Sequence, residues 1–117
     1  MGKYKIEVRK SFSAEFEKIP KNYQKNILNK IDQLETRPDI GKMLAGSLSG
    51  IRRIRVGDYR IAYKIYEKRL VVLLLKAGHR KDFYEQLTRL ARELKKTLVI
   101  VLIRKIAHTI SLKHFSS

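Results

Sequence analysis

The feature that most constrains the fold is an alternating pattern on either side of Gly57-Asp58. Before this pair, two apolar residues alternate with Arg53 and Arg55, as in a strand with one apolar and one basic face. Glycine in the first central position suits a two-residue hairpin turn. The second strand alternates in the same way, with Tyr59, Ile61, Tyr63 and Ile65 on one face and Arg60, Ala62 and Lys64 on the other. A turn at Gly57-Asp58 therefore places the basic residues of both strands on one face of a sheet.

The other periodic segments predict an α+β fold. Tyr4, Ile6 and Val8 alternate as in a half-buried strand. A short helix follows, with Ser11 or Ser13 as its N-cap, and a second helix runs from Pro20 to about residue 37. Residues 39–50 form a loop, residues 70–75 form a central strand, and Asp82 caps a last helix. The order is an N-terminal strand, a helical hairpin, a three-stranded antiparallel meander and a C-terminal helix. Two helices carry apolar stripes, namely Tyr23, Ile27, Ile31, Leu34 and Phe83, Leu87, Leu90, Leu94.

Beyond Lys96 the pattern changes, so we divide the chain into a domain of residues 1–96 and a C-terminal extension of residues 97–117. Residues 98–103 are apolar throughout, and periodicity leaves open whether they form a strand or more helix. The run is too short to span a membrane. An exposed apolar run favours aggregation, so we expect it to pack on the chain's own core or on a second copy in a homodimer.

The charge of the chain indicates a polyanionic partner. The formal net charge is +16, and residues 40–81 contain eleven lysines or arginines but only Asp58 and Glu67 as acids. Such an excess is typical of proteins that bind nucleic acid, ribosomes or an acidic protein. The chain has no cysteine and no apolar signal segment at its start, which predicts a cytoplasmic protein. The basic stretch holds no cluster of metal ligands, and we expect neither a metal nor another cofactor.

A candidate site follows from the hairpin. Arg53, Arg55 and Arg60 share a face, and a basic-aromatic motif from Gly78 to Tyr84 follows the third strand. Arg80 and Tyr84 therefore join the same side. Like charges side by side destabilise a sheet, so the set suggests a phosphate ligand. Nearby positive charge stabilises a phenolate, which makes Tyr84 a candidate proton acceptor for the 2′-OH of RNA. RNA can be cut through this hydroxyl without a metal. His79 is expected on the opposite side, as an edge residue.

Two motifs carry a resemblance to a known family. The run from Leu44 to Tyr63 resembles the central hairpin of the RelE/ParE toxin superfamily, and the run from Gly78 to Tyr84 resembles its closing motif. The resemblance covers residues 3–95. It implies a toxin of a toxin–antitoxin pair, which in RelE-type members cuts mRNA in the ribosomal A site without a metal. The expected partners are a cognate antitoxin, mRNA and the ribosome.

The resemblance also implies roles for single residues. Arg60 and Arg80 match the phosphate-stabilising arginines, and Tyr84 matches a tyrosine with a base role in some members. Arg53 and Arg55 match a basic pair that contacts RNA, and we add Lys64 and Lys81 as RNA-binding candidates. The chain departs from some members at Ala45, where they carry a basic residue. Whether Lys42 replaces that contact is left open.

Two other functions remain. ParE-type members inhibit DNA gyrase by binding rather than by cutting, and they generally lack the full set of arginines and tyrosine that this chain keeps. The third reading is a plain RNA- or ribosome-binding module.

Overall fold

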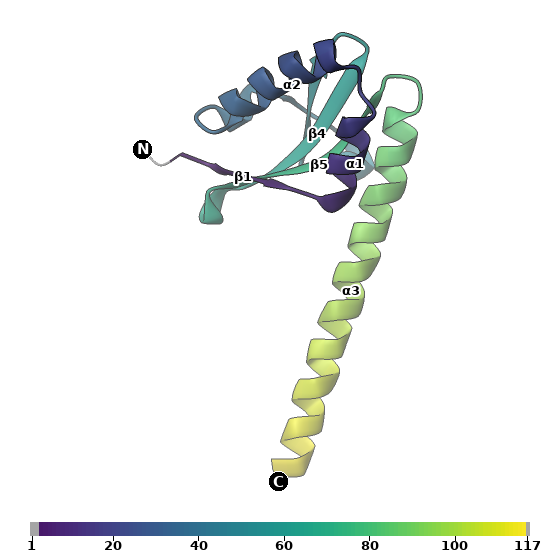
Figure 1. Cartoon of the computed structure of the whole chain (residues 1–117). Coiled ribbons are helices and arrows are strands. Elements are labelled where there is room, and N and C mark those ends of the chain that lie inside the picture. Colours follow the sequence, from purple (N-terminus) through teal and green to yellow (C-terminus); the bar gives the residue numbers. More distant parts are fainter. Residues whose placement is uncertain (1–2, 117) are drawn as a thin grey trace.

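The computed structural model describes residues 3–116 (Figure 1). One mixed sheet has the strand order β1-β5-β4-β3-β2. The expected α+β fold is confirmed, including the helical hairpin, the antiparallel meander and the C-terminal helix. The elements are β1 (Lys5–Val8), α1 (Lys10–Glu17), α2 (Lys21–Leu34), β2 (Lys42–Met43), β3 (Ile51–Val56), β4 (Tyr59–Tyr66), β5 (Val71–His79) and α3 (Phe83–Ser116).

The N-terminal strand completes the sheet on one side. β1 lies parallel to β5, with Ile6 paired to Val72, whereas β5, β4, β3 and β2 are antiparallel in turn. β5 is therefore a central strand with neighbours on both sides, which explains why residues 71–75 are apolar on both faces.

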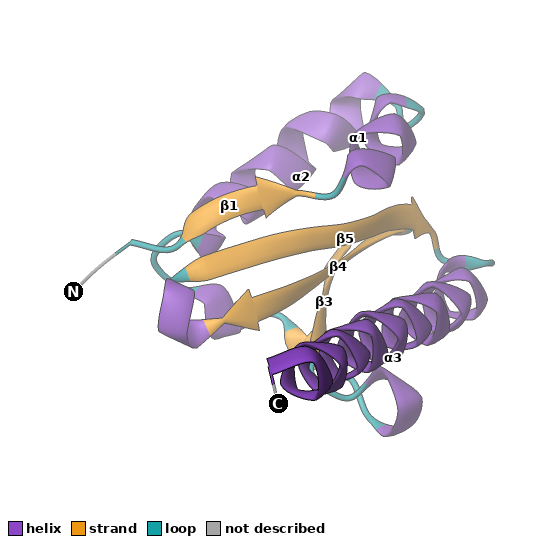
Figure 2. Ribbon diagram, turned by 90° about the horizontal axis from the view of Figure 1, so that it is seen from below, coloured by secondary structure: helices purple, strands orange, loops and turns teal. Residues whose placement is uncertain are grey.

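Two apolar clusters hold the layers together, one on each face of the sheet. Figure 2 shows α1 and α2 over one face and α3 over the other. On the first face the stripe of α2 is buried as expected, because Ile27, Ile31 and Leu34 pack on Ile61 and Tyr63. On the second face Phe83 and Leu87 of α3 pack against Ala62 and Leu75. The predicted stripe of α3 is wrong in its last turn, where Ala91 is buried and Leu94 is 39% exposed.

The expected caps of the first helix are wrong. α1 begins at Lys10, its N-cap is Arg9 in extended conformation, and no side chain caps it. Ser11 and Ser13 lie inside the helix, where the hydroxyl of Ser11 accepts a hydrogen bond of 2.6 Å from Nη1 of Arg9. The loop expected at residues 39–50 also contains the short strand β2, which pairs with β3.

The C-terminal extension continues α3 without a break. A helix of 34 residues results, about 50 Å long, and its second half projects away from the body (Figure 1). Residues 98–103 are therefore helical, and their side chains are 40 to 59% exposed. They do not pack on the chain's own core. Within residues 3–116, no helix combines the length and the apolar character needed to cross a bilayer.

A buried tyrosine links the segment that leads into β2 to the sheet. Its phenol also makes the stability of the fold sensitive to pH in the alkaline range. Tyr63 donates a hydrogen bond to the carbonyl of Pro38 and accepts one of 2.9 Å from the N–H of Gly41. Burial raises the pKa of the Tyr63 phenol above its ordinary value. The neutral phenol is thus favoured in the folded state, and its contribution to stability is complete below pH about 10.

We expect the free energy of unfolding to fall as the pH rises above about 10, because the unfolded chain then ionises at Tyr63 and the folded chain resists ionisation. Urea unfolding between pH 8 and 11 measures this slope. Tyr63→Phe should flatten it, whereas Tyr66→Phe, at a partly exposed position, should keep it. An identical slope in the two variants would contradict the assignment.

Candidate nucleic-acid interface and cleavage site

The β3–β4 hairpin places three arginines on one face of the sheet. Val56 pairs with Tyr59 across the Gly57-Asp58 turn, so Arg55 lies directly opposite Arg60, and Arg53 lies opposite Ala62. Ala62 packs under α3, which puts all three arginines on the face that α3 covers. Gly57 has a φ of 60°, and a side chain there would also collide with the ring of Tyr23 at 2.7 Å. The turn, and with it the register of the arginines, therefore depends on this glycine.

Tyr84 lies in the first turn of α3, next to the arginines of β3. The Nη1 of Arg53 donates a hydrogen bond of 3.1 Å to the hydroxyl oxygen of Tyr84. The neighbouring Phe83 is fully buried beneath the helix, and its ring meets that of Tyr84 edge to face at 5.2 Å. Tyr84 itself is 37% exposed. A buried anchor thus holds a solvent-accessible phenol beside a guanidinium.

Two of the arginines have buried donors without a partner. Arg60 is only 9% exposed, and its Nη1 donates a weak hydrogen bond of 3.4 Å to the carbonyl of Asp58. The Nε atoms of Arg53 and Arg60 are buried and have no hydrogen-bond partner among the described residues. Buried donors in folded proteins are nearly always paired, so an acceptor atom of a ligand or of a water molecule beside these two would satisfy them.

Arg80 joins the group through the hairpin turn. Its backbone N–H donates to the carbonyl of Asp58 at 2.8 Å, and its Nη1 lies 3.8 Å from the Asp58 carboxylate. Both side chains are more than half exposed, so this ion pair is weak. Gly78 pairs with Arg60, and Arg80 follows two residues later on the same side. The arginine therefore lies at the edge of the site and is available to a ligand.

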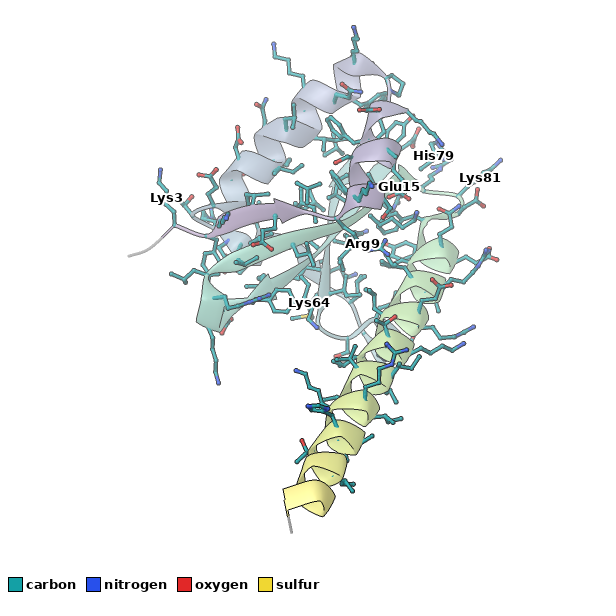
Figure 3. All side chains as sticks on the ribbon, turned by 60° about the horizontal axis from the view of Figure 1, so that its bottom comes forward. Lys3, Arg9, Glu15, Lys64, His79 and Lys81 are labelled. Atoms are coloured by element: carbon teal, nitrogen blue, oxygen red, sulfur yellow. The ribbon has the colours of Figure 1, made fainter. Side chains whose placement is uncertain are left out.

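Lys64 and Lys81 lie apart from this group. Lys64 pairs with Ile51 at the other end of the hairpin, near Leu94 and Leu98 of α3, and its Nζ is 5.4 Å from the centre of the Tyr66 ring. Lys81 lies on the exposed loop that leads into α3 (Figure 3). The structure thus brings together Arg53, Arg55, Arg60, Arg80 and Tyr84, and leaves the two lysines at the periphery.

His79 faces away from the arginines, as expected. Its ring packs edge to face on Tyr59 at 5.6 Å, on the side of the sheet covered by α1 and α2. No group of three or more histidine, cysteine, aspartate or glutamate side chains within the described part of the chain is placed to hold a metal ion.

Two cations beside this site, Lys30 and Arg37, were not predicted from the sequence. Lys30 and Arg37, from α2 and the segment after it, line a cavity together with Lys42, Arg53 and Arg55. Lys30 and Arg37 are seven residues apart, as on one face of a helix, but nothing in the sequence places that face beside β3. Arg52, which lies among the arginines in sequence, is instead structural, because its Nη1 donates to the carbonyl of Gly41 at 2.8 Å.

Comparison with known proteins assigns the class of this protein. Residues 6–84 match the family of the ParE toxin of the type II toxin-antitoxin system parDE. The chain belongs to this family, within the RelE/ParE toxin superfamily, and is a toxin of a toxin–antitoxin system. No curated protein sequence is significantly similar to it.

Solved structures give the same fold. The RelBE2 toxin–antitoxin complex of Mycobacterium tuberculosis matches with a TM-score of 0.62 and 26% identity, over 70% of this chain and 97% of that one. The RelE–RelB complex of Pyrococcus horikoshii matches with a TM-score of 0.58 and 28% identity, over 68% and 97%. The isolated Escherichia coli toxin RelE, at 17% identity, shares the fold with a TM-score of 0.57, over 74% and 98%.

Proposed function

We propose that this toxin is a ribosome-dependent mRNA endonuclease that acts in the cytoplasm and cuts through the 2′-OH without a metal. The observation that carries the proposal is the contact between Arg53 and Tyr84 beside the paired Arg55 and Arg60. It combines a proton acceptor with several cations on one accessible face. A surface that only bound RNA could use the ring of Tyr84 to stack on a base, but it would not need the hydroxyl oxygen held against a guanidinium.

The chemistry assigns a role to each group. The phenolate form of Tyr84 accepts the 2′-OH proton and becomes the neutral phenol, and the 2′ oxygen attacks the adjacent phosphorus. The bond from phosphorus to the 5′ oxygen breaks, which leaves a 2′,3′-cyclic phosphate and a 5′-OH that takes up a proton from solvent. Arg60 and Arg80 stabilise the negative charge that develops on the phosphate oxygens, and Arg53 balances the charge at Tyr84. Such electrostatic stabilisation is usually the largest single contribution to catalysis.

The second candidate function is inhibition of DNA gyrase, and the match to the ParE toxin family favours it. Inhibition by binding would use the same basic face without chemistry at Tyr84. The two functions separate in one experiment. The protein is incubated with programmed ribosomes and mRNA, and in parallel with gyrase and relaxed plasmid. Cleaved mRNA with normal supercoiling supports the nuclease, and intact mRNA with blocked supercoiling overturns it in favour of the inhibitor.

We also propose a protein partner, a cognate antitoxin. The toxins of Mycobacterium tuberculosis and Pyrococcus horikoshii that this chain resembles were solved as complexes with antitoxins. The net charge of +16 favours an acidic antitoxin segment that covers the basic face. Such a segment would compete directly with RNA.

Arg55→Ala is expected to weaken RNA binding equally for all sequences, because a phosphate contact carries no base information. The dependence of log K on log salt should become shallower by about 1. Fluorescence anisotropy with a labelled oligonucleotide at several salt concentrations measures both quantities. Lys68→Ala, at an exposed position on the turn after β4, is the matched control. A weaker affinity with an unchanged slope would make Arg55 structural.

We further propose that the projecting half of α3 is covered by a second copy of the chain. This half carries a stripe of four apolar residues that are each more than half exposed, namely Val99, Ile103, Ile106 and Ile110. Their spacings of four, three and four are those of a coiled-coil interface. The charged residues Arg104 and Lys105 lie off this stripe.

Removal of residues 97–117 is therefore expected to leave the fold intact and to convert a self-associated toxin into a monomer. The reason is that the side chains of residues 98–103 are 40 to 59% exposed and belong to neither apolar cluster. Light scattering after size exclusion gives the mass, and urea unfolding gives the stability. A parent chain that is already monomeric, or a truncated chain that unfolds, would contradict this prediction.

A further inference from the structure

A cationic cavity of about 430 Å³ lies at the open edge of the sheet. β2 pairs with β3 only at Lys42 and Met43, opposite Arg53 and Arg52. From Ile54 onward, β3 has no neighbouring strand on this side within the described residues. The cavity fills the space between this edge and the end of α2. Its lining consists of Lys30, Gln33, Arg37, Ile40, Lys42, Arg53, Ile54 and Arg55.

The lining is suited to an anion. Five of its eight residues are lysine or arginine, one is a neutral amide and none is acidic. Unpaired like charges around one cavity repel each other, and a ligand of opposite charge relieves that repulsion. Arg53 adds a buried Nε without a hydrogen-bond partner among the described residues. The cations come from α2 and the segment after it, from β2 and from β3, so the cavity is not a property of one basic helix.

The cavity also adjoins the proposed cleavage site. Arg53 lines the cavity and donates to Tyr84, and Arg55 lines the cavity and lies opposite Arg60. The two arginines thus stand between the catalytic face and the edge of the sheet. A chain of phosphates that is held at Arg60 can continue past Arg55 to Lys30, Arg37 and Lys42.

We propose that this cavity is a second phosphate subsite, which binds a backbone phosphodiester of RNA next to the segment that is cut. The choice of RNA as the ligand rests on the function proposed above, whereas the anion chemistry rests on the lining alone. The phosphate belongs either to the mRNA or to ribosomal RNA beside it, and both present the same group.

The test is a triple variant, Lys30→Gln, Arg37→Gln and Lys42→Gln, which removes three charges and leaves Arg53 and Arg55 in place. The control variant carries Lys18→Gln, Lys25→Gln and Lys68→Gln, three exposed lysines outside the cavity. Thermal unfolding checks that both fold. One arm measures binding to a single-stranded oligonucleotide that lacks the 2′-OH at the cut site. The other arm measures binding to ribosomes without mRNA.

The cavity variant is expected to bind at least one of the two ligands 10-fold or more weakly than the control variant does at about 0.1 M salt. Its salt slope should be shallower by about 2, since each single-strand phosphate contact contributes about 0.7. Loss in the first arm assigns the phosphate to mRNA, and loss in the second assigns it to ribosomal RNA. Equal binding by the two variants in both arms overturns the subsite. If binding is equal in both arms but the cavity variant binds an acidic peptide, poly-glutamate, more weakly than the control variant does, the cavity is instead a site for such a peptide.

Failure of the subsite and failure of the nuclease are distinguishable, because neither arm requires cleavage. If the parent protein cuts no mRNA but the cavity variant binds RNA more weakly than the control variant does, the subsite stands and the nuclease proposal fails. If the parent protein cuts mRNA and the two variants bind RNA equally well, the nuclease proposal stands and the subsite proposal fails.

Discussion

Tyr84→Phe is expected to slow the cleavage of mRNA on the ribosome by about 10²-fold or more. In the proposed mechanism the change removes the oxygen, held beside Arg53, that accepts the 2′-OH proton, and a positioned proton acceptor typically contributes about 10² to 10⁴ in rate. The ring remains to pack on Phe83, so the fold should persist. Toeprinting of a defined mRNA under single-turnover conditions gives the rate, and binding to the ribosome should change little.

Arg60→Ala and Arg80→Ala are expected to lower the same rate by a similar factor, because each removes a donor that stabilises charge on the phosphate. Arg60 is nearly buried, so its loss can also disturb the hairpin. Arg60→Lys separates the two effects, since it keeps the charge but loses the fork of parallel donors. Arg89→Ala, on the exposed side of α3, is the control. Full activity in Tyr84→Phe and in both alanine variants would remove the active-site assignment.

Local patterns account for most of what the sequence predicted correctly. Alternation around Gly57-Asp58 determines which residues of β3 and β4 share a face, and the observed pairing of Arg55 with Arg60 follows from that alone. The group of Arg53, Arg60 and Tyr84 was predictable for the same reason, because a hairpin and the segment that follows it are close in sequence.

Features that depend on distant contacts were not predictable in this way. The parallel pairing of β1 with β5 joins residues 5 and 71, and no turn signals it. The cavity at Lys30, Arg37 and Lys42 depends on how α2 packs over the edge of β3. Lys64 shares the basic strand face but lies at its far end, because alternation gives the face of a side chain and not its position relative to α3. The sequence did not decide whether residues 98–103 form a strand or a helix, because a continuous apolar run shows no hydrophobic periodicity.

The second large effect concerns a buried ion pair that the sequence did not reveal. The ammonium of Lys76, on β5, contacts the carboxylate of Glu15, on α1, and the side chain of Lys76 is only 8% exposed. The second oxygen of Glu15 accepts a hydrogen bond of 3.3 Å from the backbone N–H of Ala77. This N–H lies beyond the last paired residue of β1, so Glu15 satisfies the open edge of β5 there. One carboxylate thus compensates both a buried charge and a free strand edge.

Glu15→Ala is expected to lower the free energy of unfolding by about 3 kcal/mol, as measured by urea unfolding at neutral pH. Removing one partner of a buried pair leaves the other charge uncompensated, at a cost of about 3–5 kcal/mol, and the 28% exposure of Glu15 places this pair at the lower end. Glu17→Ala, an exposed position on the same helix, should cost far less.

The double variant Glu15→Ala with Lys76→Met distinguishes an uncompensated charge from lost packing. Methionine removes the ammonium and keeps much of the apolar stem, so most of the lost stability should return. A double variant as unstable as Glu15→Ala alone would show that the hydrogen bond to Ala77 and the packing of α1 dominate. Because Lys76 lies on the strand that leads to Arg80 and Tyr84, a loosened α1 should also reduce mRNA cleavage in Glu15→Ala, and the double variant should restore it.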